Sequence, residues 1–197
     1  MNHLLQNDLD LLSSTSFTMC AGLDEAGRGA LAGPVVVAAV VLDYHIDLPV
    51  LNDSKQLTAR QRDKLYSEIV SSAICYSIAA IPAKTIDRVN ILQATLLGFK
   101  KAFFKLEPKA QYALVDGKDI PSTIPGRAVI KGDSRQACIA AASVLAKVYR
   151  DRLMIEMDKL YPEYSFAQHK GYGTKAHYAA LNSFGACKEH RKTFRLH

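Results

Sequence analysis

Two neighbouring segments near the N-terminus carry the clearest strand-like patterns of hydrophobic residues. A short apolar run over 19–23 ends in the adjacent carboxylates Asp24 and Glu25, and a longer run of Pro, Val, Ala and Leu follows at 34–42. The second run is apolar on both faces, as expected for a strand at the centre of a sheet that is covered on both sides. The stretch 19–43 therefore predicts a strand, a glycine-rich loop and a second strand.

The remaining pattern alternates helices with strands. Thr58 and Gln61 fit a capping box at the start of a helix that ends near Ser72, and Pro82 ends a strand-like alternation at 73–81. Apolar spacing predicts further helices at 90–106, 134–160 and 175–183, and strands at 111–115 and 127–131. Residues 1–18 have a weak helical pattern of leucines and predict a packing extension at most, and 166–174 predicts a loop.

Three of these strands end in acidic residues: Asp24 with Glu25, then Asp116, then Asp133. Because an α/β sheet gathers functional groups at strand ends along one edge, the four carboxylates are expected to meet. Successive strand residues point to opposite faces, so Asp24 and Glu25 converge only if their strand ends there. Asp133 has a second interpretation as a helix N-cap, with Gln136 at the third helical position, and the two interpretations are compatible.

The loop after the first two acids contains Gly27, Arg28 and Gly29. Without a Cβ, both glycines can take positive φ and let a ligand approach closely, and the arginine adds a cation. A phosphate loop for nucleotides is an alternative interpretation. However, the spacing through Gly33 is GxGxxxG rather than GxGxxG, two acids precede it, and Pro34 blocks a normal helix start. These features disfavour nucleotide binding.

Four carboxylates with no His or Cys close by in sequence form a hard-oxygen site, which suits Mg²⁺ or Mn²⁺ rather than zinc. A phosphodiester is the natural substrate of such a site, because two ions can activate an attacking water and stabilise the departing oxygen. The acids would then serve as metal ligands. Without metal, the clustered carboxylates would repel one another.

Length and composition are ordinary for one folded unit. The chain has 197 residues, of which 49% are hydrophobic and 22% charged, and this composition excludes disorder. The longest apolar run is too short to span a bilayer, and residues 1–18 contain acids but no Lys or Arg, so neither an anchor nor a signal peptide is expected. Four scattered cysteines without a CxxC pair predict buried thiols in a reducing cytoplasm.

Positive charge is concentrated toward the C-terminus. Residues 165–197 hold six Lys or Arg against one Glu, and so carry +5 of the net charge of +6. The six are Lys170, Lys175, Lys188, Arg191, Lys192 and Arg195. This segment suits phosphate binding by a metal-dependent nuclease, and a solvated basic surface is the alternative. His169, His177, His190 and His197 match no metal-binding spacing and predict surface or phosphate contacts.

The stretch 24–34, DEAGRGALAGP, resembles the signature of ribonuclease HII, the type 2 enzyme that cuts RNA in RNA/DNA hybrids, which usually reads DEAGRGPLAGP. Ala30 stands where the family usually has proline, a change that softens the loop because proline fixes φ, but that removes no ligand. The family's other segments are matched by VDG at 115–117, KGD at 131–133, HKGYGT at 169–174 and DSK at 53–55. The resemblance covers roughly 21–174.

This resemblance implies the α/β ribonuclease H-like fold, with a five-stranded mixed sheet flanked by helices. It implies one catalytic domain over 1–197, with a core at 19–160 and a basic, helical C-terminal extension at 161–197. The implied activity is hydrolysis of the RNA strand of hybrids and nicking on the 5′ side of single ribonucleotides in duplex DNA, leaving 3′-hydroxyl and 5′-phosphate ends. The implied role is ribonucleotide removal in DNA replication and repair.

The resemblance also implies roles for individual residues. Metal binding falls to four acids, Asp24, Glu25, Asp116 and Asp133. They would hold two Mn²⁺ or Mg²⁺ ions, with the first acid shared by both. Substrate binding falls to Gly27, Arg28, Gly29, Tyr172, Lys55, Lys147 and Lys170. The glycine loop would read the 2′-hydroxyl, the tyrosine would pack against the sugar and the lysines would contact phosphates, although each lysine taken alone is better explained as solvated.

The sister enzyme ribonuclease HIII carries an additional N-terminal substrate-binding domain and a different glycine loop. Only 23 residues precede Asp24, so no such domain is expected here. A non-catalytic binder of hybrid duplexes is a further alternative, but four acids near a phosphate backbone are unfavourable unless metal neutralises them. The sequence predicts a cytoplasmic monomer that binds RNA/DNA hybrids and ribonucleotide-containing DNA, and no membrane.

Overall fold

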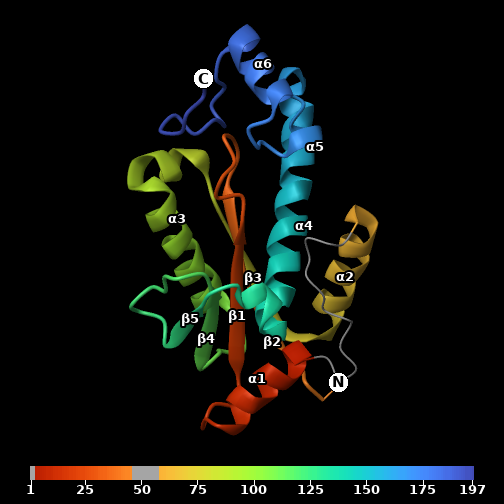
Figure 1. The fold of residues 1–197 in the computed structure, drawn as a ribbon, viewed down its shortest axis with the longest axis vertical. Helices are drawn as coiled ribbons and strands as arrows, with labels where there is room; N and C mark the ends of the chain where they lie inside the picture. Colours follow the sequence, from red (N-terminus) through yellow and green to blue (C-terminus); the bar gives the residue numbers. More distant parts are fainter. Residues whose placement is uncertain (1–2, 46–57) are drawn as a thin grey trace.

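A computed structural model describes residues 3–45 and 58–197. Its helices and strands, in chain order, are α1 (His3–Ser13), β1 (Cys20–Ala26), β2 (Val35–Leu42), α2 (Ala59–Ser72), β3 (Ala73–Ile81), α3 (Ala83–Lys105), β4 (Tyr112–Asp116), β5 (Gly126–Val129), η2 (Gly132–Ser134), α4 (Ala137–Leu160), η3 (Pro162–Tyr164), α5 (Phe166–His169) and α6 (Lys175–Phe184). The elements alternate much as the hydrophobic pattern predicts. Figure 1 shows a sheet with helices on both sides and the C-terminal segment at one end of the molecule.

The described strands form one mixed sheet in the order β3-β2-β1-β4-β5. β1, β2 and β3 pair antiparallel, whereas β1, β4 and β5 run parallel. The predicted five-stranded mixed sheet is confirmed. Because parallel neighbours end on the same edge, the acids that end β1 and β4 and follow β5 are brought to one side of the molecule.

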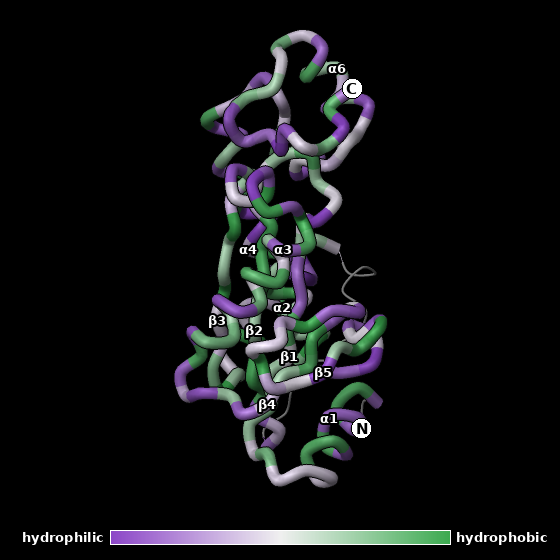
Figure 2. The backbone as a smooth tube through the Cα atoms, turned by 90° about the vertical axis from the view of Figure 1, so that its left-hand side faces the viewer, coloured by the Kyte–Doolittle hydropathy of each residue, from purple (hydrophilic) through white to green (hydrophobic). Residues whose placement is uncertain are grey.

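Hydrophobic layers cover both faces of the sheet. The strand β2 is buried along its whole length, and Val36 and Ala38 pack toward α4 while Val37 and Ala39 pack toward α3. Figure 1 shows the strands between α3 and α4, and in Figure 2 much of the backbone near the labels β1 and β2 has the green of hydrophobic residues. The Ala-rich start of α4 lies very close to β1, since a Cβ added at Gly22 would lie 2.1 Å from the carbonyl carbon of Cys138. The expected central, two-sided strand is therefore present.

Several boundaries differ from the sequence predictions. The capping box of Thr58 and Gln61 is confirmed, but α3 begins at Ala83 and is interrupted at Asn90, whose φ is 67°. The Asn90 side chain accepts a hydrogen bond from the backbone N–H of Gln93, so Asn90 caps the second part of the helix, which is the part that the sequence predicted. The predicted loop 166–174 contains the one-turn helix α5.

The N-terminal helix does more than cover the core. Asp8 on α1 is buried, and its Oδ2 accepts hydrogen bonds from the hydroxyl of Tyr44 at 2.7 Å and from the backbone N–H of Cys138 at 2.8 Å. It therefore satisfies an N–H in the first turn of α4, which has no side-chain cap of its own. Its Oδ1 is buried and has no hydrogen-bond partner among the described residues. Burial raises the pKa of Asp8.

Replacing Asp8 by Asn and by Ala is expected to have different effects on stability. The amide of Asn keeps an oxygen that can accept both hydrogen bonds, so the Asn variant should be at least as stable as the wild type at pH 7. The Ala variant loses both bonds and should be less stable by about 2 kcal/mol. Because the folded-state pKa is raised, the carboxyl group favours folding most at low pH and loses that contribution as pH rises through the folded pKa. Urea unfolding at pH 4 and pH 7 measures both effects; equal losses in the two variants would contradict this account.

Two further observations concern the whole described chain. Cys20, Cys75 and Cys138 are buried free thiols as expected, whereas Cys187 is only partly buried. Among the described residues, no helix is both long enough and apolar enough to cross a membrane.

Candidate active site

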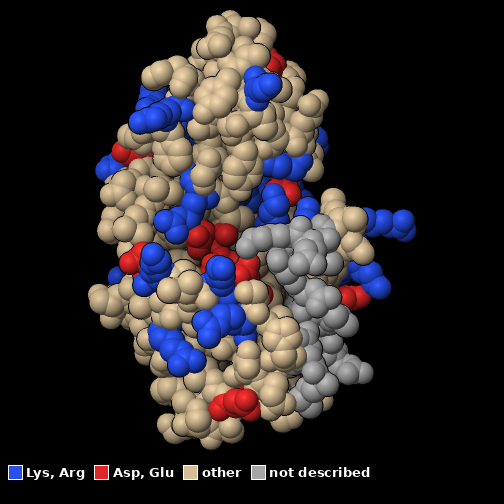
Figure 3. All heavy atoms as spheres, in the orientation of Figure 1, with Lys and Arg blue, Asp and Glu red and all other residues tan. Residues whose placement is uncertain are grey.

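The four acids line one cavity of about 320 Å³ at the edge of the sheet. The described residues that line it are Asp24, Glu25, Ala26, Gly27, Arg62, Asp116, Asp133, Ser143, Lys147 and Tyr172. The pairing of β1 with β4 ends at Leu23 and Val115, and the cavity opens beyond that point. In Figure 3, acidic side chains gather in the middle of one face with Lys and Arg around them.

The sequence analysis required the strand that carries Asp24 and Glu25 to end beside them. In the structure it does not end there. β1 continues to Ala26, and Asp24 and Glu25 still pair with Ala38 and Val37 of β2. Only the pairing with β4 stops before these acids. The strand thus remains anchored on one edge while its other edge is open, which lets both acids line the cavity.

Asp24 is the most deeply buried of the four acids, with about 6% of its surface exposed. Its Oδ1 accepts a hydrogen bond from the backbone N–H of Glu25 at 2.7 Å. Burial raises the pKa of Asp24 well above its usual value, and the nearby carboxylates of Glu25 and Asp116 raise it further. An ionised carboxylate in this position is unfavourable unless a cation approaches it.

The other acids are held by local contacts. Burial raises the pKa of Glu25, and Arg28, whose Nη1 lies 3.3 Å from Glu25 Oε1, opposes that shift. The Oδ1 of Asp116 accepts a hydrogen bond from the backbone N–H of Gly132, and so ties the end of β4 to the turn η2. Asp133 is buried in η2, and the N-cap of α4 is Gln136. The alternative interpretation of Asp133 as the N-cap of that helix is therefore wrong.

The acids share a cavity without forming a closed ligand shell. Within residues 3–45 and 58–197, no three His, Cys, Asp or Glu side chains are arranged to hold a metal ion. The donor set still fits a hard divalent cation, because it offers oxygen ligands, four of them carboxylates, and because burial and two neighbouring carboxylates raise the pKa of Asp24. The described histidines and cysteines do not line the cavity.

The two glycines of the Gly27-Arg28-Gly29 loop differ in structure. Gly27 has a φ of +95°, and a Cβ added there would lie 1.9 Å from Nε of Arg150. Gly29 does not have positive φ, so the expectation for this glycine is wrong. It is exposed, and a Cβ added there would meet no atom within 4 Å. The first glycine is required by the fold, and the second leaves the backbone open to a ligand.

Tyr172 lies on the cavity wall, half-buried. The guanidinium carbon of Arg150 lies 5.2 Å from the centre of its ring and Nζ of Lys147 lies 5.8 Å from it. Lys147 also lines the cavity and pairs with Asp151 at 2.7 Å. Lys170 does not line the acid cavity; it borders an adjoining hollow between α2 and α4, and its Nζ donates to the carbonyl of Ala167. Lys55 lies outside the described residues.

Several residues at or near the site were missed by the sequence analysis. Arg62 and Ser143 line the cavity, and neither belongs to a motif. Arg191 is fully buried and not part of a solvated basic surface, and His177 and His190 are buried and not at the surface. No local signal marks these residues, because their neighbours come from distant parts of the chain.

The strand order, the flanking helices and the acids on β1, at the end of β4 and in the turn after β5 define a ribonuclease H-like enzyme. Ribonuclease H2 from Pyrococcus horikoshii has the same fold, with a TM-score of 0.77 and 27% identity over 91% of this chain and 95% of that one. A second similar structure, Bst-RNase HIII in complex with Mn²⁺, has a TM-score of 0.67 and 18% identity over 90% of this chain and 67% of that one, and supports the fold alone.

Sequence comparison identifies the family. The family model described as Ribonuclease HII matches residues 21–197. Ribonuclease HII of Syntrophotalea carbinolica is 52% identical over 185 residues, which cover 93% of this chain and 88% of that protein. The chain belongs to the ribonuclease HII family, and so it is an endoribonuclease that hydrolyses the RNA strand of RNA/DNA hybrids.

Proposed function

We propose that this enzyme also nicks duplex DNA on the 5′ side of a single embedded ribonucleotide and leaves 3′-hydroxyl and 5′-phosphate ends. The observation that carries the proposal is that the acids, Gly27 of the glycine loop and Tyr172 line one cavity, so phosphate chemistry and sugar recognition can act on the same nucleotide. The enzyme would act as a cytoplasmic monomer, with 1–197 as one catalytic domain, and would remove ribonucleotides during DNA replication and repair.

The four acids would hold two divalent ions, Mg²⁺ or Mn²⁺. Asp24 is the best candidate for the shared ligand, because it is the most buried acid and is close enough to Glu25 and Asp116 for both to raise its pKa. Bound ions would supply charge for activating water and for stabilising the departing oxygen. The protein contributes the fixed positions of the acids: Asp24 is held by the N–H of Glu25, and Asp116 by the N–H of Gly132.

The backbone at 27–29, of which residues 28 and 29 are exposed, would recognise the ribose. A 2′-hydroxyl can both donate and accept a hydrogen bond, and the open surface at Gly29 lets the minor-groove edge of the substrate approach. Tyr172, which is bridged to the same loop through Ala30, would pack against the sugar. Lys147 beside it would contact a neighbouring phosphate, and Lys170 and Lys55 would extend that contact along the strand.

Cleavage of three duplexes tests this proposal. Each end-labelled duplex contains one ribonucleotide, no ribonucleotide or a full RNA strand, and each is incubated with Mg²⁺, Mn²⁺ or EDTA. The expected result is a metal-dependent nick on the 5′ side of the single ribonucleotide and no cut in the all-DNA duplex. If the full hybrid is cut but the duplex with a single ribonucleotide is not, the proposed nicking at single ribonucleotides is wrong. If hybrids are bound and never cut, the chain is a binding protein.

A further inference from the structure

The loop 27–34 lies between two segments of the C-terminal region. Ala30 forms an isolated β-bridge with Tyr172, and Ala32 forms another with His190. The loop is therefore paired with two C-terminal segments that are far away from it in sequence. Figure 1 shows the tip of the β1–β2 loop reaching into this C-terminal segment.

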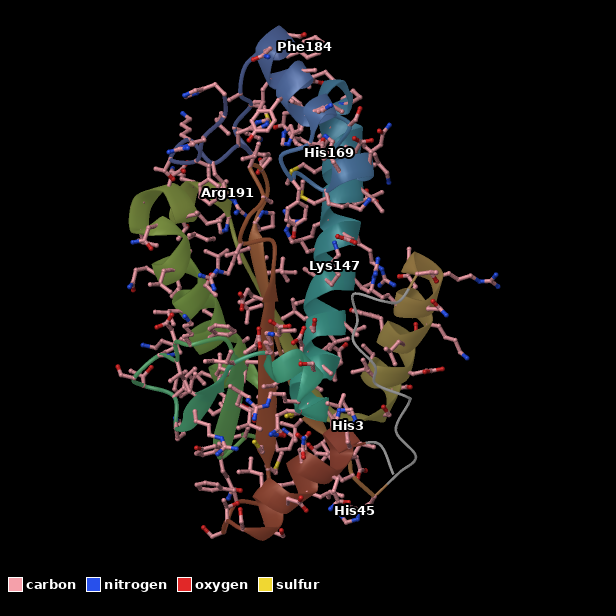
Figure 4. All side chains as sticks on the ribbon, viewed as in Figure 1. His3, His45, Lys147, His169, Phe184 and Arg191 are labelled. Atoms are coloured by element: carbon pink, nitrogen blue, oxygen red, sulfur yellow. The ribbon has the colours of Figure 1, made fainter. Side chains whose placement is uncertain are left out.

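All three guanidinium nitrogens of Arg191 donate hydrogen bonds to the backbone of this loop. It is fully buried, and its three nitrogens donate to the carbonyls of Gly33 at 3.0 Å, Arg28 at 2.8 Å and Gly27 at 2.7 Å. Within the described residues it forms no ion pair with a carboxylate. Burial and the nearby Arg150 lower the pKa of Arg191 to about 9, so its charge is retained at neutral pH. Figure 4 shows Arg191 beside the tip of the loop.

Arg150 of α4 donates hydrogen bonds to other carbonyls of the same loop. It is also fully buried and donates to the carbonyls of Pro34, Ala32 and Lys170. Because Lys170 lies two residues before Tyr172, this arginine joins the loop to the segment that carries the tyrosine. The two guanidinium groups together make six hydrogen bonds, five of them to carbonyls between residues 27 and 34.

A pair of buried histidines is linked by hydrogen bonds to the backbone carbonyl of Tyr172. The backbone N–H of Cys187 donates to Nδ1 of His190, which leaves the proton of this ring on Nε2. That Nε2 lies 3.0 Å from Nε2 of His177, and Nδ1 of His177 lies 3.0 Å from the carbonyl of Tyr172. The network therefore assigns a single direction of donation, from His190 to His177 to Tyr172. Burial lowers the pKa values of both rings, that of His190 to about 4, so both are neutral at pH 7.

We infer that Arg191 and the His190–His177 pair are positioning residues, which fix the ribose-reading loop and Tyr172 relative to each other. The adjacent residues His190 and Arg191 act on two parts of the cavity lining: the first is linked through His177 to the carbonyl of Tyr172, and the second donates to the carbonyls of Gly27 and Arg28. This inference rests on the proposed function, in which these walls contact the ribonucleotide. It assigns no role to the four acids.

Two pairs of variants test the inference. Arg191→Lys keeps the charge but cannot reach three carbonyls in one plane, and Arg195→Lys is its exposed control. His190→Asn keeps an acceptor for the N–H of Cys187 but loses the donor to His177, whereas His190→Gln restores a donor near the position of Nε2. For the single-ribonucleotide duplex, kcat/KM is expected to fall about 100-fold in Arg191→Lys, mainly through KM, because a misplacement of about 1 Å has that cost. His190→Asn should raise KM, and His190→Gln should restore it in part.

The readouts separate positioning from a general loss of folded protein. Partial unfolding lowers kcat and the number of Mn²⁺ ions bound per chain but leaves KM unchanged, whereas mispositioning raises KM and leaves Mn²⁺ binding unchanged. The inference is overturned if the folded Arg191→Lys and His190→Asn variants have wild-type KM, or if they lose only kcat and Mn²⁺ binding. Should Arg191→Lys not fold, the His190 pair alone decides. Failure of the wild type to distinguish one ribonucleotide from none would instead overturn the proposed function.

Discussion

Replacing Asp24 by Asn is expected to lower kcat for cleavage of the RNA strand by about 1,000-fold or more, because metal charge at the reacting phosphate is worth several kcal/mol. Asn has the same shape and can still accept the hydrogen bond from the N–H of Glu25, which Asp24 accepts at 2.7 Å. The substitution therefore removes the charge of the most buried of the four cavity acids and little else. The neutral amide of Asn cannot balance the positive charge of a bound cation.

The same substitution should not destabilise the metal-free protein. Burial and the carboxylates of Glu25 and Asp116 raise the pKa of Asp24, so its ionised form opposes folding at neutral pH. In EDTA, the free energy of unfolding of Asp24→Asn is expected to equal or exceed that of the wild type. Glu156→Gln, at an exposed residue of α4 paired with Lys159, is the control and should keep full activity. An inactive variant that is also strongly destabilised would mean that Asp24 has a structural role.

Replacing Gly27 by Ala is expected to cost both stability and activity. The residue has a φ of +95°, and the new Cβ would lie 1.9 Å from Nε of Arg150, a buried side chain that holds the loop. Backbone strain and overpacking of this kind cost about 2 kcal/mol or more of folding free energy. Because Arg150 must move, the loop shifts as well, and kcat/KM should fall by about 100-fold. Urea unfolding and steady-state kinetics measure the two losses.

Gly29→Ala is the matched control for Gly27→Ala. Gly29 is exposed, its φ is not positive, and the added Cβ meets no atom of the protein within 4 Å. Its free energy of unfolding should therefore stay within about 0.5 kcal/mol of the wild type. If kcat/KM nevertheless falls in this variant, the loss indicates that the loop contacts the substrate. Equal destabilisation by the two substitutions would contradict the different roles given to the two glycines.

The features that could be predicted from the sequence are those with a local signal. The fully apolar run of β2 indicates a strand covered on both faces, and the spacing of Thr58 and Gln61 indicates a helix start. The acids at 24, 116 and 133 could be placed together because each stands at or just after the end of a strand and parallel strands share an edge. The family motifs then supplied the expectation of a nuclease.

The features that could not be predicted depend on contacts between distant segments. An arginine in a basic tail or on a helix is expected to be exposed, yet Arg191 and Arg150 are fully buried because backbone carbonyls accept their hydrogen bonds, five of them in the loop 27–34. His177 and His190 are buried for a similar reason, since each completes the hydrogen bonding of the other. Asp8 acts on a helix that begins 129 residues later, at Ala137. The spacing of neighbouring residues contains none of this information.

Titration with Mn²⁺ tests the central claim, that the acid cavity is the metal site of the enzyme. The electron paramagnetic resonance signal of free Mn²⁺ gives the number of ions bound and their dissociation constant for the wild type, Asp24→Asn and Glu156→Gln. The wild type and Glu156→Gln should bind alike, and Asp24→Asn should bind at least about tenfold more weakly, since even outer-shell changes have that effect. Equal binding by all three proteins would contradict the claim and place the metal elsewhere.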